Sequence, residues 1–171
     1  MAEPAERRQA VLPVSERKKY VSLLFFGLMN LTKETDKLLL RRRLWRNHHR
    51  VLDALSRDLA RSMSELAERV DASKQALHKS IQGLVRAGFV QVEVDPLHRR
   101  AKSVKLTPAG RRFEGRLDVI QEDMMERVAA KMGVEAMQTW AVVMEEIAKA
   151  QGMNDTADVP EPPRKRRRES N

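Results

Sequence analysis

The sequence contains no cysteine, which excludes disulfide bonds, thiolate zinc sites and thiol-based redox switches. It also has no run of about 18 apolar residues of the kind a membrane-spanning helix needs, and its N-terminus is charged where a signal peptide is apolar. Glycine-rich phosphate loops, metal-ligand motifs and nucleophile–base pairs are missing from it too. We therefore expect a soluble cytoplasmic protein that is not an enzyme, with no catalytic residues, no cofactor and no metal.

Positive charge is present in excess. The chain has 33 Lys and Arg residues against 24 Asp and Glu, a formal net charge of +9 over 171 residues. The excess is concentrated in residues 1–110, whereas residues 111–151 are negative on balance. Because a protein that neutralises phosphates releases counterions, this charge balance favours a nucleic acid partner, from which the acidic segment faces away.

Residues 62–86 carry two helix signals separated by a turn. Ser62 and Glu65 form a capping box, and Ser73 caps a second helix after an interruption at Asp71. The second helix has an apolar side at helical spacing, formed by Leu77, Ile81, Leu84 and Val85. Its first two turns carry a polar and basic face, formed by Lys74, Gln75, His78 and Lys79. This arrangement is typical of a recognition helix, whose first side chains reach base edges in the major groove of DNA.

A two-stranded hairpin is predicted next. Gly88 suits the end of the second helix, since glycine adopts the left-handed conformation at little cost. Residues 90–94 and 103–106 then alternate apolar with polar side chains on either side of a break. Thr107 and Pro108 provide the cap and the first position of a long helix. The predicted fold class is therefore mainly α (α+β), a winged helix-turn-helix with a two-stranded wing.

Long amphipathic helices are predicted at both ends of this unit, because apolar residues recur there at helical spacing. A winged helix has a small core of its own, so the apolar sides of the long helices need other partners. The simplest arrangement is a homodimer, in which these helices pack against each other and against the same helices of a second copy. The alternative is a bundle within one chain. The expected organisation is a disordered N-terminus (1–14), an N-terminal dimerisation helix with its connection (15–43), a winged helix-turn-helix (44–110), C-terminal dimerisation helices (111–151) and a disordered basic tail (152–171).

Three groups of motifs in this unit fit one known family. Residues 64–70 read SELAERV, residues 84–90 read LVRAGFV, and the predicted wing carries Asp95-Pro96 and Arg99-Arg100 ahead of LTPAG at 106–110. These motifs resemble the DNA-binding domain of the multiple antibiotic resistance regulator (MarR) family of bacterial transcription factors, except that His98 stands where the family usually has a carboxylate. The resemblance implies a homodimer that binds a pseudo-palindromic operator in double-stranded DNA, and a crevice for small aromatic or anionic effectors.

The predicted DNA contacts lie on the second helix and the wing: Ser73, Lys74, Gln75, His78, Lys79, Arg99, Arg100 and Lys102. Gln75 suits adenine, because its amide can both donate and accept, whereas lysines act as point charges toward guanine or phosphate. Arg99 and Arg100 suit a narrow minor groove with its strong negative potential. The alternatives are an ordinary solvated helix face and loop charges that only keep the hairpin soluble.

Trp45 and His49 could line an effector crevice where the winged helix meets the dimerisation helices. The alternative is that Trp45 belongs to the core and His49 is exposed. His48 and His49 suggest a metal at first sight, but adjacent side chains on a helix point in different directions and cannot share one ion.

The C-terminal tail carries five consecutive basic residues at 164–168, near three prolines. It could be an inert solvated tail, a nonspecific tether to DNA, or an address resembling a nuclear-import signal, which would mean nothing in a bacterium.

The function predicted from these features is that of a homodimeric transcriptional regulator, a repressor of nearby genes released by a small-molecule effector and located on the nucleoid when bound. The alternatives are a sequence-tolerant architectural or chromosome-associated DNA-binding protein, and a winged-helix adaptor for protein interactions. The basic helix face and the wing arginines argue against the adaptor.

Overall fold

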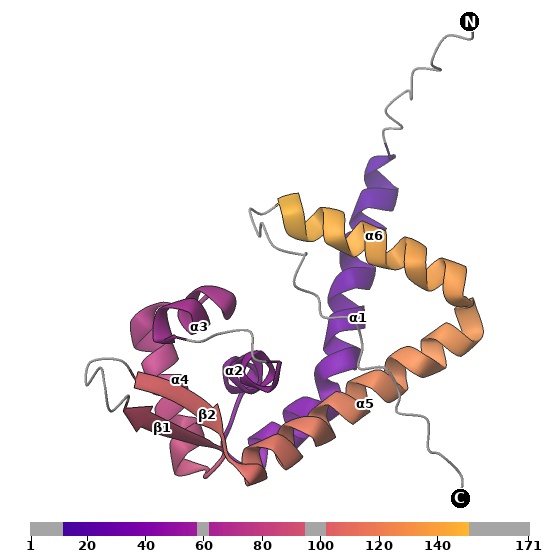
Figure 1. The fold of residues 1–171 in the computed structure, drawn as a ribbon. Coiled ribbons are helices and arrows are strands. Elements are labelled where there is room, and N and C mark those ends of the chain that lie inside the picture. The colour runs from indigo at the N-terminus through magenta and orange to yellow at the C-terminus, as the bar shows by residue number, and fades with distance from the viewer. Residues whose placement is uncertain (1–11, 58–61, 95–101, 151–171) are drawn as a thin grey trace, which may run out of the picture.

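The computed structural model describes residues 12–57, 62–94 and 102–150. Figure 1 shows a winged-helix part to one side and three long helices to the other. The elements within the described ranges are α1 (Val14–Leu40), α2 (Arg46–Ser56), α3 (Met63–Arg69), α4 (Lys74–Arg86), β1 (Val90–Val94), β2 (Lys102–Leu106), α5 (Pro108–Met132) and α6 (Val134–Ala150). This order confirms the predicted mainly α winged-helix fold.

Side-chain caps set the starts of the helices around the wing. The Ser62 and Ser73 hydroxyls accept from the N–H groups three residues ahead, at 3.1 and 3.2 Å, and start α3 and α4. Thr107 caps α5 in the same way, with Pro108 at the first helical position. Each cap satisfies a backbone donor that a helix start leaves unpaired, which is why the sequence placed these starts correctly.

The two strands pair antiparallel in one ladder that runs from Val90↔Leu106 to Val94↔Lys102. Gly88 has φ 74°, the left-handed conformation expected between α4 and β1. The Thr107 hydroxyl donates to the Gly88 carbonyl at 2.7 Å, so one side chain both caps α5 and fastens the base of the wing.

The core lies inside the winged helix. It gathers side chains from the end of α1, from α2 to β2 and from the first half of α5, among them Leu39, Leu44, Leu52, Leu66, Leu77, Ile81, Leu84, Phe89, Leu106, Phe113 and Leu117. Phe89 and Phe113 stack with ring centroids 4.4 Å apart. One expectation for α4 was wrong: Val85 is 44% exposed, because it lies beside the buried stripe and not on it.

The long helices depart from the expected boundaries. α1 begins at Val14, within the segment expected to be disordered (1–14). Of the other residues expected to be disordered, 1–11 and 152–171 fall outside the described residues, and positions 12 and 13 precede the helix. α5 continues through position 110 to Met132, where Gly133 with φ 81° ends it. The winged helix and the C-terminal region therefore share one unbroken helix, which packs against α1, α2 and α6.

Candidate nucleic-acid interface

The first two turns of α4 form an exposed polar and basic surface. Lys74, Gln75, His78 and Lys79 are all exposed, together with the capping residue Ser73. The opposite side of the helix is buried through Leu77, Ile81 and Leu84. The structure thus brings together every predicted DNA contact on this helix, at its N-terminal end, where the N–H groups also favour an anion.

Residues of α2 fix the position of α4. The Asn47 amide donates to the Ser80 hydroxyl at 2.8 Å, and that hydroxyl donates in turn to the Ala76 carbonyl at 3.1 Å. Gly83 leaves room for the imidazole of His48, whose Nε2 would lie 2.5 Å from a Cβ at that position. Sequence reasoning missed these contacts, because residues about 33 positions apart give no periodic signal.

His78 is not isolated on the helix surface. Its Nε2 lies 2.9 Å from the amide nitrogen of Gln82, one turn further along α4. Gln82 was not among the predicted site residues, although its i, i+4 spacing from a predicted contact is a signal that the sequence contains. The pair fixes the orientation of the imidazole.

The wing is described in its strands and not at its tip. Arg99 and Arg100 lie outside the described residues, and Lys102 is placed only by its backbone, opposite Val94 at the end of the ladder. Further along the strands, Lys105 forms an ion pair with Glu93 at 2.6 Å.

Trp45 and His49, the two residues predicted to line an effector crevice, are placed differently from the alternative in which Trp45 belongs to the core and His49 is exposed. Trp45 precedes α2, is 58% exposed, and has its ring against that of His48 with centroids 5.7 Å apart. His49 is half-buried. Trp45 is exposed because α2 starts at Arg46 and leaves Trp45 outside the helix. His49 is half-buried because α2 packs against α5.

The two histidines differ in their surroundings, as adjacent helical positions must. The Trp45 N–H donates to Nδ1 of His48, and burial lowers the pKa of His48. Burial also lowers the pKa of His49, against the opposing effect of the carboxylates of Asp53, Asp118 and Asp36.

Glu114 of α5 is a buried carboxyl next to these groups. Burial, together with the neighbouring carboxylates of Asp118 and Asp53, raises the pKa of Glu114 to about 7. Arg57 interacts electrostatically with Glu114, but its Nε is already bound to Asp53 at 2.6 Å. Sequence analysis did not single out this cluster, because its members come from two helices far apart in the chain.

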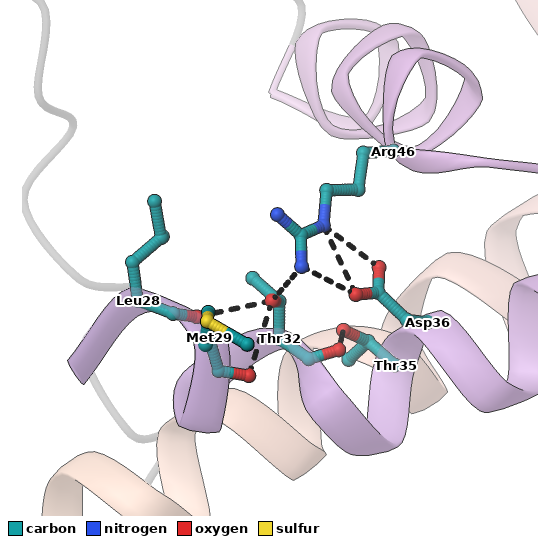
Figure 2. Close-up of polar contacts among 6 residues, drawn as sticks. All are labelled: Leu28, Met29, Thr32, Thr35, Asp36 and Arg46. Atoms are coloured by element: carbon teal, nitrogen blue, oxygen red, sulfur yellow. Dashed lines mark hydrogen bonds and ion pairs between the residues drawn. The ribbon is translucent and has the colours of Figure 1, made fainter. Parts of the chain in front are cut away.

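A second polar contact joins α1 to α2. Arg46 binds both carboxylate oxygens of Asp36 through Nε, at 3.1 and 3.0 Å, and donates through Nη2 to the Asp36 carboxylate at 2.7 Å and the Thr32 hydroxyl at 2.8 Å (Figure 2). The planar guanidinium binds one carboxylate in a bidentate geometry, which a lysine could not reproduce. This junction connects the N-terminal helix to the start of the winged helix.

Within the described ranges, none of the helices is long and apolar enough to cross a membrane. Residues 44–101, which include α2, the helix-turn-helix and the first strand, match the sequence model of the MarR family. A characterised relative is the HTH-type transcriptional regulator PetP of Rhodobacter capsulatus, which is 24% identical over 128 residues, 75% of this chain and 77% of PetP.

Solved structures have a similar fold over most of the chain. The PcaV transcriptional regulator from Streptomyces coelicolor, in complex with its natural ligand, has a TM-score of 0.64 at 19% identity, covering 84% of this chain and 99% of PcaV. NadR in complex with 4-hydroxyphenylacetate has a TM-score of 0.60 at 17% identity, over 86% and 99% of the two chains. A mutant MepR from S. aureus bound to an oligodeoxyribonucleotide has a TM-score of 0.55 at 14% identity, over 77% and 97%.

Proposed function

We propose that this chain, which belongs to the MarR family of transcriptional regulators, is a homodimeric, sequence-specific DNA-binding repressor. A small-molecule effector would release the repressor from its operator. Transcriptional regulators are not a class of enzyme, and the operator-bound form would lie on the nucleoid in the cytoplasm.

The observation that carries this proposal is the surface of α4. Four polar or basic side chains are exposed over its first two turns, while the opposite side is held by buried leucine and isoleucine. A helix that only covers the core needs no such concentration of donors, whereas a helix in the major groove does. The MepR neighbour bound to an oligodeoxyribonucleotide has the same fold, which supports this use of the surface.

Base readout by Gln75 is tested with DNA sites selected from a random pool. Gln75→Ala should lose discrimination at one base pair of each half-site, by about 1–3 kcal/mol, because a bidentate contact with adenine disappears. Gln138→Ala, an exposed glutamine on α6, is the matched control and should leave discrimination unchanged. Unaltered discrimination at every position in Gln75→Ala would remove this residue from the readout.

The contribution of the wing is tested by a salt series. The double substitution Arg99→Ala and Arg100→Ala should weaken binding while preserving dimerisation and thermal stability, since their proposed partners are on the DNA. The salt dependence should flatten by about one unit for each phosphate contact removed. If the double variant has the DNA affinity and the salt dependence of the wild type, Arg99 and Arg100 do not contact DNA.

Dimerisation is supported by exposed apolar side chains on the long helices, where a single chain covers little of them. They include Val21, Leu23, Leu24, Phe25, Phe26, Leu28 and Met29 on α1, and Trp140, Val142, Val143 and Ile147 on α6. Contiguous apolar surface of this kind marks an interface, and a twofold dimer would cover it with the same helices of a second copy. Sedimentation equilibrium tests this, and a monomer at micromolar concentration would contradict it.

The basic tail is proposed as a nonspecific tether. Deleting residues 153–171 should lower affinity for selected and random DNA by a similar factor, and added salt should remove the difference. A loss confined to the selected site would mean that the tail reads sequence, and no loss on either DNA would make it inert.

Genome-wide footprinting, followed by transcription from the bound promoters, tests repression itself. Deleting the gene should raise transcription beside the strongest sites. Binding with little preference over random DNA would favour the architectural alternative, and no DNA binding would favour the protein adaptor.

A further inference from the structure

Helices α2 and α5 pack together, and each contributes two titratable residues one helical turn apart. On α2 these are His49 and Asp53, and on α5 they are Glu114 and Asp118. Residues at i and i+4 lie on one side of a helix. Ligand atoms of His49, Glu114 and Asp118 all lie within 4.8 Å of one another. One imidazole and two carboxylates from facing helices thus converge on a single point.

Glu114 is the anomalous member of this group. Its side chain is only 3% exposed, and its Oε1 has no hydrogen-bond partner. Buried carboxylates in proteins are normally paired with a cation, hydrogen-bonded through both oxygens or bound to a metal. Arg57, the basic side chain close by, is half-exposed and holds Asp53. Glu114 Oε1 therefore lacks a donor, in a carboxyl group that lies close to the imidazole of His49 and the carboxylate of Asp118.

We propose that His49, Glu114 and Asp118 bind a divalent first-row transition-metal ion, with water completing its coordination. The site goes beyond the proposed function, because nothing in DNA binding requires it. Imidazole together with carboxylate suits Zn²⁺, Mn²⁺ or Fe²⁺, while the imidazole disfavours Mg²⁺ and Ca²⁺. Ligands about 2.1 Å from a tetrahedral ion are about 3.4 Å apart, so small side-chain rotations would close the set.

The charge of the junction favours a cation in the same way. Asp53, Glu114 and Asp118 face one another, and Asp36 adds negative potential at His49. Arg57 offsets part of this charge, and a divalent ion would offset the rest. An anionic effector would meet repulsion at this point. Because α2 belongs to the winged helix and α5 continues to the terminal helices, a bound ion would fix one part relative to the other.

The test uses the full chain, stripped of metal by a chelator and dialysed. Titration calorimetry with Zn²⁺ should give one saturable site per chain, and Zn²⁺ should raise the melting temperature of the wild type. Co²⁺ should produce visible absorption bands that Zn²⁺ abolishes. Mg²⁺ at a hundredfold excess should not compete. Absence of saturable Zn²⁺, Co²⁺ or Mn²⁺ binding would overturn the proposal.

Variants decide whether these residues are the ligands. Glu114→Gln, Asp118→Asn and His49→Gln should each weaken Zn²⁺ binding by 100-fold or more and remove the Co²⁺ bands. Glu122→Gln, an exposed carboxylate one turn beyond Asp118 on α5, is the control and should bind as wild type does. Wild-type binding in Glu114→Gln and Asp118→Asn would overturn the assignment.

Two further measurements separate metal binding from folding and from DNA binding. Glu114→Gln keeps the shape of the side chain and removes a group that can ionise in a buried position, so at pH 8 its metal-free melting temperature should equal or exceed that of the metal-free wild type. A lower melting temperature would mean that the carboxylate has a structural partner, and this would overturn the proposal. All of these measurements are made without DNA, so failure of the proposed repressor function leaves their outcome intact.

Discussion

The winged helix and the long terminal helices have similar periodic apolar residues in sequence, yet these side chains differ in how far they are buried within one chain. In the winged helix, leucines such as Leu52 and Leu84 are completely buried by other elements of the same chain. On α1, Phe25 is 59% exposed, and most of its neighbours on both sides of that helix are exposed as well. Periodicity therefore predicts that a helix has an apolar side, and it does not tell which chain covers that side.

The two regions also differ in how their helices are held. Around the wing, polar side chains fasten one element to another, as Thr107 does for Gly88 and Asn47 for Ser80. On α6 the hydrogen bonds and ion pairs of the described side chains stay within the helix, as between Lys149 and Glu146. The winged helix is consequently a closed unit, while the terminal helices depend on apolar contacts that one chain supplies only in part.

The largest effect is expected from charging the exposed apolar side of α1. Phe25→Glu combined with Phe26→Glu should weaken dimerisation at least about 1000-fold, about 4 kcal/mol, because burial of two phenyl rings is lost in each copy. Analytical ultracentrifugation measures the dissociation constant. Lys33→Gln, an exposed polar position on the same helix, should have no effect. An intact dimer in the double variant would mean that this side of α1 is not the interface.

The next effect is expected at the closed core. Gly110→Ala should destabilise the winged helix by about 3 kcal/mol, because the new Cβ would lie 2.0 Å from the backbone oxygen of Phe89 and force β1 from α5. Urea unfolding followed by circular dichroism provides the measurement. Gly115→Ala on the same helix meets no atom within 4 Å and should be neutral or stabilising by up to about 1 kcal/mol. Equal effects of the two substitutions would refute this view of the core.

A smaller effect is expected from the contact that positions α4. Asn47→Ala should cost about 1 kcal/mol of unfolding free energy, since the Ser80 hydroxyl loses one of its two partners. DNA affinity should fall by a few-fold with the base preference unchanged, because Asn47 acts only through the helix position. A change in base preference would instead place Asn47 in the readout.

The smallest effect is expected at the joint between the regions. Arg46→Gln should lower the free energy of unfolding by about 0.5–1 kcal/mol, because its ion pair with Asp36 is exposed although it is bidentate. Lys37→Gln, which breaks an exposed pair within α1, should change it by less still. Thermal unfolding of both variants compares the two losses of stability. A larger loss in Lys37→Gln than in Arg46→Gln would show that the Arg46–Asp36 ion pair does not stabilise the joint between the regions.

Local chemistry explains which parts of the fold could be predicted. Ser73 and Thr107 cap helices through backbone groups three residues away, and Gly88 adopts a conformation that its own lack of a Cβ permits. Those interactions need no distant partner, so the sequence pattern was sufficient. The exposed residues at the start of α4 were also predictable, because helical spacing places them opposite Leu77 and Ile81.

Other parts could not be predicted, because they depend on which helices pack together. The exposure of Trp45 and the partial burial of His49 follow from the start of α2 and its packing on α5. Spacing within α2 showed that His48 and His49 diverge, but gave no indication of what each would meet. His48 meets Gly83 of α4, and His49 meets carboxylates of α5.

By itself, the sequence determined the helix-turn-helix, the wing and the basic surface of α4, since caps, turns and apolar periodicity act over a few residues. Only the tertiary structure decided that Glu114 and Asp118 stand against His49, and that Arg46 grips Asp36 across the joint. The physical reason is that a helix pattern fixes the direction of each side chain around its own axis, whereas the group it meets depends on how that axis packs against others.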